Sequence, residues 1–124
     1  MTNWFEELPE QCPPKESLVP TGQVYYRLSK SAPPTSDDFL SFRANNPNRV
    51  FKNVSECISR SLSVWDNIDK CMNITKLPRH RGKSHVIEIT LNNTDGQILK
   101  TFGENHYSWW RSTTFSLATV KVAS

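Results

Sequence analysis

The chain has 124 residues, a formal net charge of +3 and 36% hydrophobic residues, which is enough for one domain with a modest core. That charge is too small to indicate a nucleic-acid binder by itself. No apolar run approaches the roughly 20 residues that span a bilayer. The acidic start at 1–7 also lacks the basic and apolar regions of a secretion signal. We therefore expect no membrane contact and a cytoplasmic location.

The three cysteines, Cys12, Cys57 and Cys71, form an odd set with no Cys-x-x-Cys pair. This count argues against a disulfide scaffold or a zinc ribbon and suits a reducing cytoplasm. We expect Cys57 and Cys71 to be small buried residues on helices. Because His80 and His85 do not reproduce a common zinc spacing, no metal site is predicted.

The N-terminal segment 1–22 is rich in proline and glutamate. Proline removes backbone donors and disfavours helix in the residue before it, so this segment should be an irregular arm. We expect Trp4, Phe5 and Leu8 to hold the arm against the body. The rest of the chain, 23–124, is then a single domain.

The first elements of that domain are a strand over 23–28, indicated by its β-favouring residues, and a helix over 37–43. The two aspartates at the start of this helix are interpreted as caps, since carboxylates favour the positive end of a helix. Phe39 and Phe42, three residues apart, should share its buried face.

Strict alternation makes 85–91 the clearest strand, with Ile87, Ile89 and Leu91 on one face. A turn at 92–96 should return the chain as a hairpin partner over 97–102. Shorter elements are expected as helices over 54–60 and 67–73 and as strands over 61–64 and 115–122. The pattern predicts one compact α+β domain, with a small, mainly antiparallel sheet of roughly four to six strands and short flanking helices.

The segment 106–111, His-Tyr-Ser-Trp-Trp-Arg, is the strongest local hint of function. Two adjacent tryptophans on a strand face opposite sides, so we expect Trp109 or Trp110 to be at least partly exposed. An exposed indole beside His106 and Arg111 would stack on a planar ligand, a base or a partner's side chain.

A basic segment precedes the strand at 85–91 and would add charge to these stacking rings. The predicted partner-binding surface consists of Arg79, His80, Arg81, Lys83, Trp109, Trp110 and Arg111. Charge with stacking surfaces is typical of single-stranded nucleic-acid binding, in which each stacked base contributes about 1–3 kcal/mol. Acidic protein surfaces satisfy the same charges, so a protein partner is favoured and nucleic acid is the alternative.

A strand carrying Arg27, a short strand carrying Ser61 and Ser63, and a later acidic residue resemble small ADP-ribosyltransferase-like domains. The family's Ser-Thr-Ser signature reads Ser-Leu-Ser here, and the acidic position would be Glu88 or Glu104. The resemblance implies NAD as a cofactor held by Arg27 and Ser63. It also implies a carboxylate that stabilises the oxocarbenium character of the reacting ribose.

His106 is the best single candidate for acid-base work, because its pKa lies near neutrality. Two classes follow. One is an interaction module of the accessory, immunity or adaptor type, which needs no cofactor. The other is a minimal transferase, whose candidate catalytic residues are Arg27, Ser63, Glu88, Glu104 and His106. We favour the module, because the chain has no glycine-rich phosphate loop. The module predicts an exposed apolar patch at the tryptophans, whereas the enzyme predicts that Arg27, Ser63 and an acid share a cleft.

Overall fold

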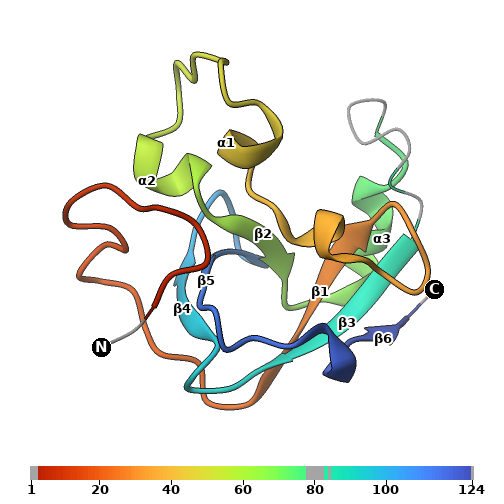
Figure 1. The fold of residues 1–124 in the computed structure, drawn as a ribbon. Coiled ribbons are helices and arrows are strands. Elements are labelled where there is room, and N and C mark those ends of the chain that lie inside the picture. Colours follow the sequence, from red (N-terminus) through yellow and green to blue (C-terminus); the bar gives the residue numbers. More distant parts are fainter. Residues whose placement is uncertain (1–2, 78–82, 84, 124) are drawn as a thin grey trace.

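The computed structural model describes residues 3–77, 83 and 85–123 and places them in one small α+β domain (Figure 1), as the sequence predicts. Its antiparallel sheet contains β1 (Gln23–Ser29), β2 (Leu62–Trp65), β3 (His85–Leu91), β4 (Gly96–Lys100), β5 (His106–Arg111) and β6 (Lys121–Val122), in the order β4-β5-β2-β1-β3-β6. The short helices are η1 (Ser36–Phe39), α1 (Phe42–Asn45), α2 (Glu56–Ser59), α3 (Ile68–Ile74) and η3 (Leu117–Thr119).

Side-chain caps set where the helices begin. The Ser55 hydroxyl accepts the Ile58 N–H at the start of α2, and the Asn67 side chain accepts the Lys70 N–H at the start of α3, each at 3.1 Å. These bonds satisfy backbone donors that the first turn of a helix leaves free. The helix expected over 54–60 is confirmed in shorter form, and the helix expected over 67–73 is confirmed with a shift of one residue.

The single helix expected over 37–43 is wrong. Leu40 is extended, and Ser41 caps a new helix by accepting the Ala44 N–H at 3.1 Å. The break separates the two phenylalanines that were expected to share a face: Phe39 is fully buried, whereas Phe42 is 50% exposed.

The hairpin expected between β3 and 97–102 is also wrong, because β4 pairs with β5. A tight turn still follows β3: the Asp95 carboxylate accepts the Asn92 N–H at 2.7 Å. The next residue, Gly96, has φ of +128°, and a Cβ there would lie 2.0 Å from the Trp110 carbonyl oxygen. Because this short turn joins the outer strand β4 to β3 at the far side of the strand order, the sheet must curve strongly (Figure 1).

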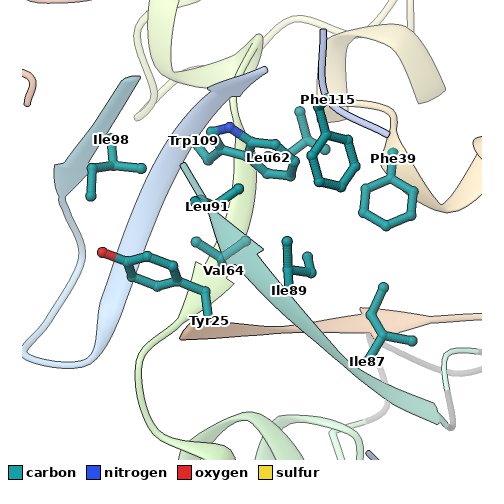
Figure 2. Packing of buried hydrophobic residues seen from close by; sticks show 10 residues of the cluster. All are labelled: Tyr25, Phe39, Leu62, Val64, Ile87, Ile89, Leu91, Ile98, Trp109 and Phe115. Carbon is teal, nitrogen blue, oxygen red and sulfur yellow. The ribbon is translucent and has the colours of Figure 1, made fainter. Parts of the chain in front are cut away.

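One face of the sheet carries the main core. Ile87, Ile89 and Leu91 are fully buried on it, which confirms the alternation that predicts β3. Figure 2 shows the ten buried residues of this cluster: Tyr25, Phe39, Leu62, Val64, Ile87, Ile89, Leu91, Ile98, Trp109 and Phe115.

The opposite face is covered as well. Leu28 and Val86 pack there with Cys71 of α3. Trp109 points into the main core, and Trp110 points to the other side, where its indole N–H donates to the Cys57 carbonyl at 2.9 Å. Both indoles are fully buried. The expectation of an exposed tryptophan is therefore wrong, because it assumed a sheet with one solvated face.

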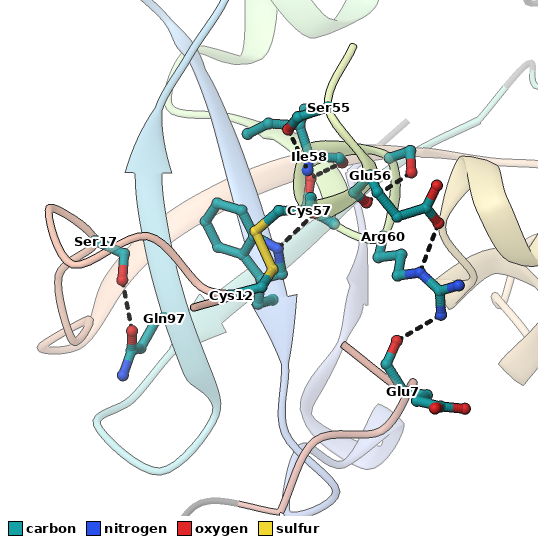
Figure 3. Close-up of a disulfide and its surroundings, with 12 residues drawn as sticks. Glu7, Cys12, Ser17, Ser55, Glu56, Cys57, Ile58, Arg60 and Gln97 are labelled. Carbon is teal, nitrogen blue, oxygen red and sulfur yellow. Dashed lines mark hydrogen bonds and ion pairs between the residues drawn. A yellow bond between two sulfur atoms is a disulfide. The ribbon is translucent and has the colours of Figure 1, made fainter. Parts of the chain in front are cut away.

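The arm is joined to the body by a disulfide between Cys12 and Cys57 (Figure 3), which corrects the expectation of no disulfide. Around it, the Ser17 hydroxyl donates to the Gln97 side chain at 2.5 Å. The bond places Cys57, expected as a buried thiol, in a covalent link, whereas Cys71 is a buried free thiol as predicted.

The last predicted strand, 115–122, is shorter than expected. Phe115 turns into the core, with its ring centroid 4.8 Å from that of Trp109. The chain then forms η3 before pairing with β3 as β6. Among the helices of the described residues, none has the length and apolar character to cross a membrane.

Candidate functional site

Arg27 lies where β1 and β2 diverge. These two strands are joined by one residue pair, Tyr26 with Trp65. Beyond that pair the Arg27 guanidinium fills the gap, donating to the Ser63 carbonyl at 2.7 Å. It also donates to the carbonyls of Asp38, at 2.9 Å, and Leu40, at 3.3 Å. Its side chain thus replaces sheet hydrogen bonds and joins three segments.

A pocket of about 640 Å³ opens beside this guanidinium. Its walls include residues of β1, β2, β5, α1 and α3 and of the segments that connect them. The charged, aromatic and hydrogen-bonding side chains considered below are, among the lining residues, Arg27, Phe42, Arg49, Ser63, Trp65, Lys83, Phe102 and His106. Three of these are cations, and among the described residues no carboxylate lines the pocket.

The buried charge of Arg27 has no direct counterion: among described residues, no carboxylate oxygen lies within 4.0 Å of it. The Asp38 carboxylate is directed elsewhere, accepting from the backbone of Lys30 at 2.8 Å and of Thr35 at 3.0 Å. Burial lowers the pKa of Arg27 to about 10, although the Asp38 charge partly opposes this shift. The group remains charged at neutral pH, so the pocket is electropositive.

The pKa of Lys83 is also lowered by its surroundings. Burial lowers its pKa, and the nearby charges of Arg27 and Lys30 lower it further. Like charges held close together each disfavour the protonated form of the other. An anion placed between Arg27 and Lys83 would remove that repulsion.

Ser63 and His106 form a hydrogen-bonded pair in the pocket. They lie on the same face of β2 and β5, diagonal across the register that pairs Ser63 with Ser108. The Ser63 hydroxyl is 2.9 Å from His106 Nε2, and His106 Nδ1 is 3.0 Å from the Thr101 carbonyl oxygen. Because a carbonyl only accepts, Nδ1 carries the proton, and Nε2 accepts from the serine hydroxyl.

The surroundings of His106 keep its ring neutral. Burial lowers the pKa of His106, the hydrogen bond to Thr101 opposes the shift, and the Arg27 charge lowers it further. The ring also packs edge-on against Trp65, with centroids 5.0 Å apart. A neutral imidazole with a free lone pair directed at a hydroxyl is able to act as a base.

Phe102 forms an exposed rim of the pocket. It is 70% exposed, and its φ of 58° lies in the left-handed region, which bulky residues rarely adopt. Its ring lies 5.5 Å from the His106 ring, between centroids. Phe42, half exposed, also lines the pocket. A strained aromatic residue presented to solvent is a feature found at binding sites.

Of the predicted catalytic residues, the structure brings Arg27, Ser63 and His106 together and leaves Glu88 and Glu104 out of the pocket lining. Among the predicted partner-binding residues, Lys83 lines this pocket. Arg79, His80 and Arg81 lie outside the described residues.

The predicted surface of Trp109, Trp110 and Arg111 is wrong, because all three are buried. The Arg111 guanidinium packs over the Phe5 ring, 3.8 Å from its centroid, and donates to the Phe39 carbonyl at 3.4 Å. It thereby holds the arm to the core instead of facing a partner.

Sequence reasoning missed Thr101 and Phe102. Both lie between β4 and β5, in a connection that the wrong hairpin assignment concealed. The Phe-Gly pair after a strand was the available signal, since glycine at 103 marks a turn.

Comparison with protein-family models, with curated proteins and with solved structures finds no match.

Proposed function

We propose that this domain binds an anionic, nucleotide-type ligand in the pocket beside Arg27. The observation that carries this proposal is a buried guanidinium without a carboxylate partner, at the edge of an open pocket. Burying an unpaired charge is costly, so a protein that retains one usually supplies an anion to it or uses it. Three backbone carbonyls offset part of that cost, and a bound anion would offset more.

The rest of the lining supports a phosphate-bearing ligand with a planar group. Lys83 and Arg49 add two cations, and both side chains bind phosphate oxygens well. Phe102, Phe42 and Trp65 add aromatic surface. Planar rings stack on such side chains. Phosphate at the cations and a base at the aromatic residues match the two halves of a nucleotide.

A minimal ADP-ribosyltransferase-like enzyme that uses NAD is a narrower form of this proposal. Arg27 and Ser63 lie at one pocket, as that resemblance implies, but neither Glu88 nor Glu104 lines it. Without a carboxylate beside the reacting ribose, the oxocarbenium charge would lack its main stabilising group. We therefore propose NAD first as a ligand and only then as a substrate.

A protein partner or single-stranded nucleic acid is a second candidate, favoured by the electropositive pocket rim at Arg49 and Lys83. The buried tryptophans no longer support it. As for the compartment, the composition favours the cytoplasm, whereas the Cys12–Cys57 bond is typical of oxidising compartments. We propose an oxidising compartment, because the disulfide would persist there.

A thermal-shift screen tests the proposal. The panel is NAD, ADP-ribose, ATP, a short single-stranded RNA and adenosine, which carries the base without phosphate. A ligand present at about 100 times its Kd adds roughly 2.7 kcal/mol to the free energy of unfolding. We expect stabilisation by phosphate-bearing nucleotides and none by adenosine at the same concentration. Stabilisation by RNA alone would favour the second candidate, and no shift with any nucleotide at millimolar concentration would overturn the proposal.

A further inference from the structure

We propose that Ser63 is a nucleophile activated by His106, and that the pocket cleaves a small ester or thioester that carries an anionic group. The anionic character of the substrate rests on the proposed function, whereas the reactivity of Ser63 does not.

The hydrogen-bond chain gives the direction of proton transfer. The Thr101 carbonyl holds the proton on His106 Nδ1 at 3.0 Å, which leaves Nε2 to accept from the Ser63 hydroxyl at 2.9 Å. Serine is a weak nucleophile until an adjacent base takes its proton, and the base needs a third group to orient it. Ser63, His106 and Thr101 fill these three roles in order.

The pair is also accessible and rigid. Ser63 and His106 are both half-buried and both line the open pocket. Each is on a strand of the sheet, and Trp65 and Phe102 pack against the imidazole ring. A site on strands holds its geometry better than one on loops. A small substrate would therefore meet a positioned hydroxyl.

The reaction balances without a metal or an oxidant. The Ser63 oxygen bonds to the carbonyl carbon while its proton moves to His106 Nε2. As the tetrahedral intermediate collapses, the carbon–oxygen or carbon–sulfur bond breaks and His106 returns the proton to the leaving group. Water, deprotonated by His106, then attacks the acyl-serine, releasing the carboxylic acid and restoring the hydroxyl. The charge of Arg27, bonded to the Ser63 carbonyl at 2.7 Å, is the nearby group that favours the oxyanion.

A fluorophosphonate probe tests this reactivity, since it phosphonylates activated serines without needing the natural substrate. We expect one adduct per folded chain at pH 7.5, mapped by peptide mass spectrometry to Ser63. Ser63→Ala should abolish it. His106→Gln keeps a hydrogen-bonding amide but cannot take the proton, so labelling should slow by about 100-fold or more.

Ser17→Ala is the matched control, because Ser17 is also half-buried and donates to a neutral side-chain acceptor outside the pocket. Its labelling rate should equal that of the parent chain. An adduct spread over several serines, no adduct, or equal rates for the parent and His106→Gln would overturn the proposal, provided that circular dichroism shows each variant folded. If the probe labels Ser63 but no nucleotide stabilises the chain, the result would support Ser63 as a nucleophile and reject the proposed nucleotide ligand.

Discussion

The backbone carbonyl of Ser63 accepts the Arg27 Nη1 N–H at 2.7 Å, which ties the buried cation of β1 to the residue whose hydroxyl meets His106. The same guanidinium closes the gap between β1 and β2. Fold stability and the chemistry of the pocket therefore depend on one side chain, and the two roles have to be separated by the choice of variants.

Replacing Arg27 by methionine tests its structural role. The change removes a costly buried charge, but it also removes the Arg27 donor from the carbonyls of Asp38 and Ser63, whereas the Leu40 carbonyl still accepts from the Asn45 side-chain amide at 3.4 Å. Each buried unsatisfied group costs about 1–3 kcal/mol, so we expect the hydrogen-bond loss to outweigh the relief of burial. Urea denaturation should show a loss of about 2 kcal/mol or more. A methionine variant as stable as the parent chain would mean that desolvation of the guanidinium cancels its three bonds.

Lys83→Met separates ligand binding from the fold, because Lys83 lines the pocket and is only half-buried. A hydrogen bond to a charged group contributes about 1.5–3 kcal/mol, so the variant should bind a phosphate-bearing nucleotide about tenfold or more weakly in calorimetry. Lys15→Met removes the same charge from the exposed arm and should leave the affinity unchanged. Equal weakening in both variants would point to net charge instead of a site.

Counting thiols tests the disulfide. The native chain should give no fast reaction with a thiol reagent, because Cys12 and Cys57 are joined and burial raises the pKa of Cys71 to about 12. Denaturation without reductant should reveal one thiol, and reduction should reveal three. Reduction should also lower stability by roughly 2–4 kcal/mol, as expected for a long closed loop. Three thiols in the unreduced denatured chain would contradict the bond.

The pH profile of Ser63 labelling tests whether His106 is the base. Burial lowers the pKa of His106 below its ordinary 6.5, the Thr101 bond opposes this, and the Arg27 charge adds to it. The reactive form is the neutral ring, so the rate should be level above 6.5 and fall as the pH drops through the lowered pKa. A rate that keeps rising through pH 8–9 would indicate direct ionisation of another group.

Part of the fold follows from sequence alone. Alternation of Ile87, Ile89 and Leu91 predicts β3 because a strand over a core has a period of two. The strand that pairs with β4 could not be predicted from the sequence in the same way. A short turn after β3 favours a local hairpin, yet Gly96 lets the chain turn away and pair with β5. Strand pairing is decided by the whole sheet, which local pattern does not report.

The sequence predicts a cleft shared by Arg27, Ser63 and an acid, but it does not connect His106 with that group. Arg27, Ser63 and His106 are each chemically suited to a site, but the register between β2 and β5 is what brings Ser63 and His106 together. The prediction of an exposed tryptophan failed because the exposure of Trp109 and Trp110 depends on whether both faces of β5 are covered. The disulfide was missed because an odd count of cysteines does not say which two meet.

The most direct test of the ligand pocket is an NMR titration that follows the tryptophan indole N–H signals. Trp65 lines the pocket, whereas Trp109 is buried in the core on the other face and serves as an internal control. Adding ADP-ribose or ATP should shift the Trp65 signal in a saturable way and leave the Trp109 signal in place. In Lys83→Met the shift of the Trp65 signal should be far smaller at the same nucleotide concentration. A Trp65 signal that does not move at saturating nucleotide, or equal shifts of both signals, would contradict binding at this pocket.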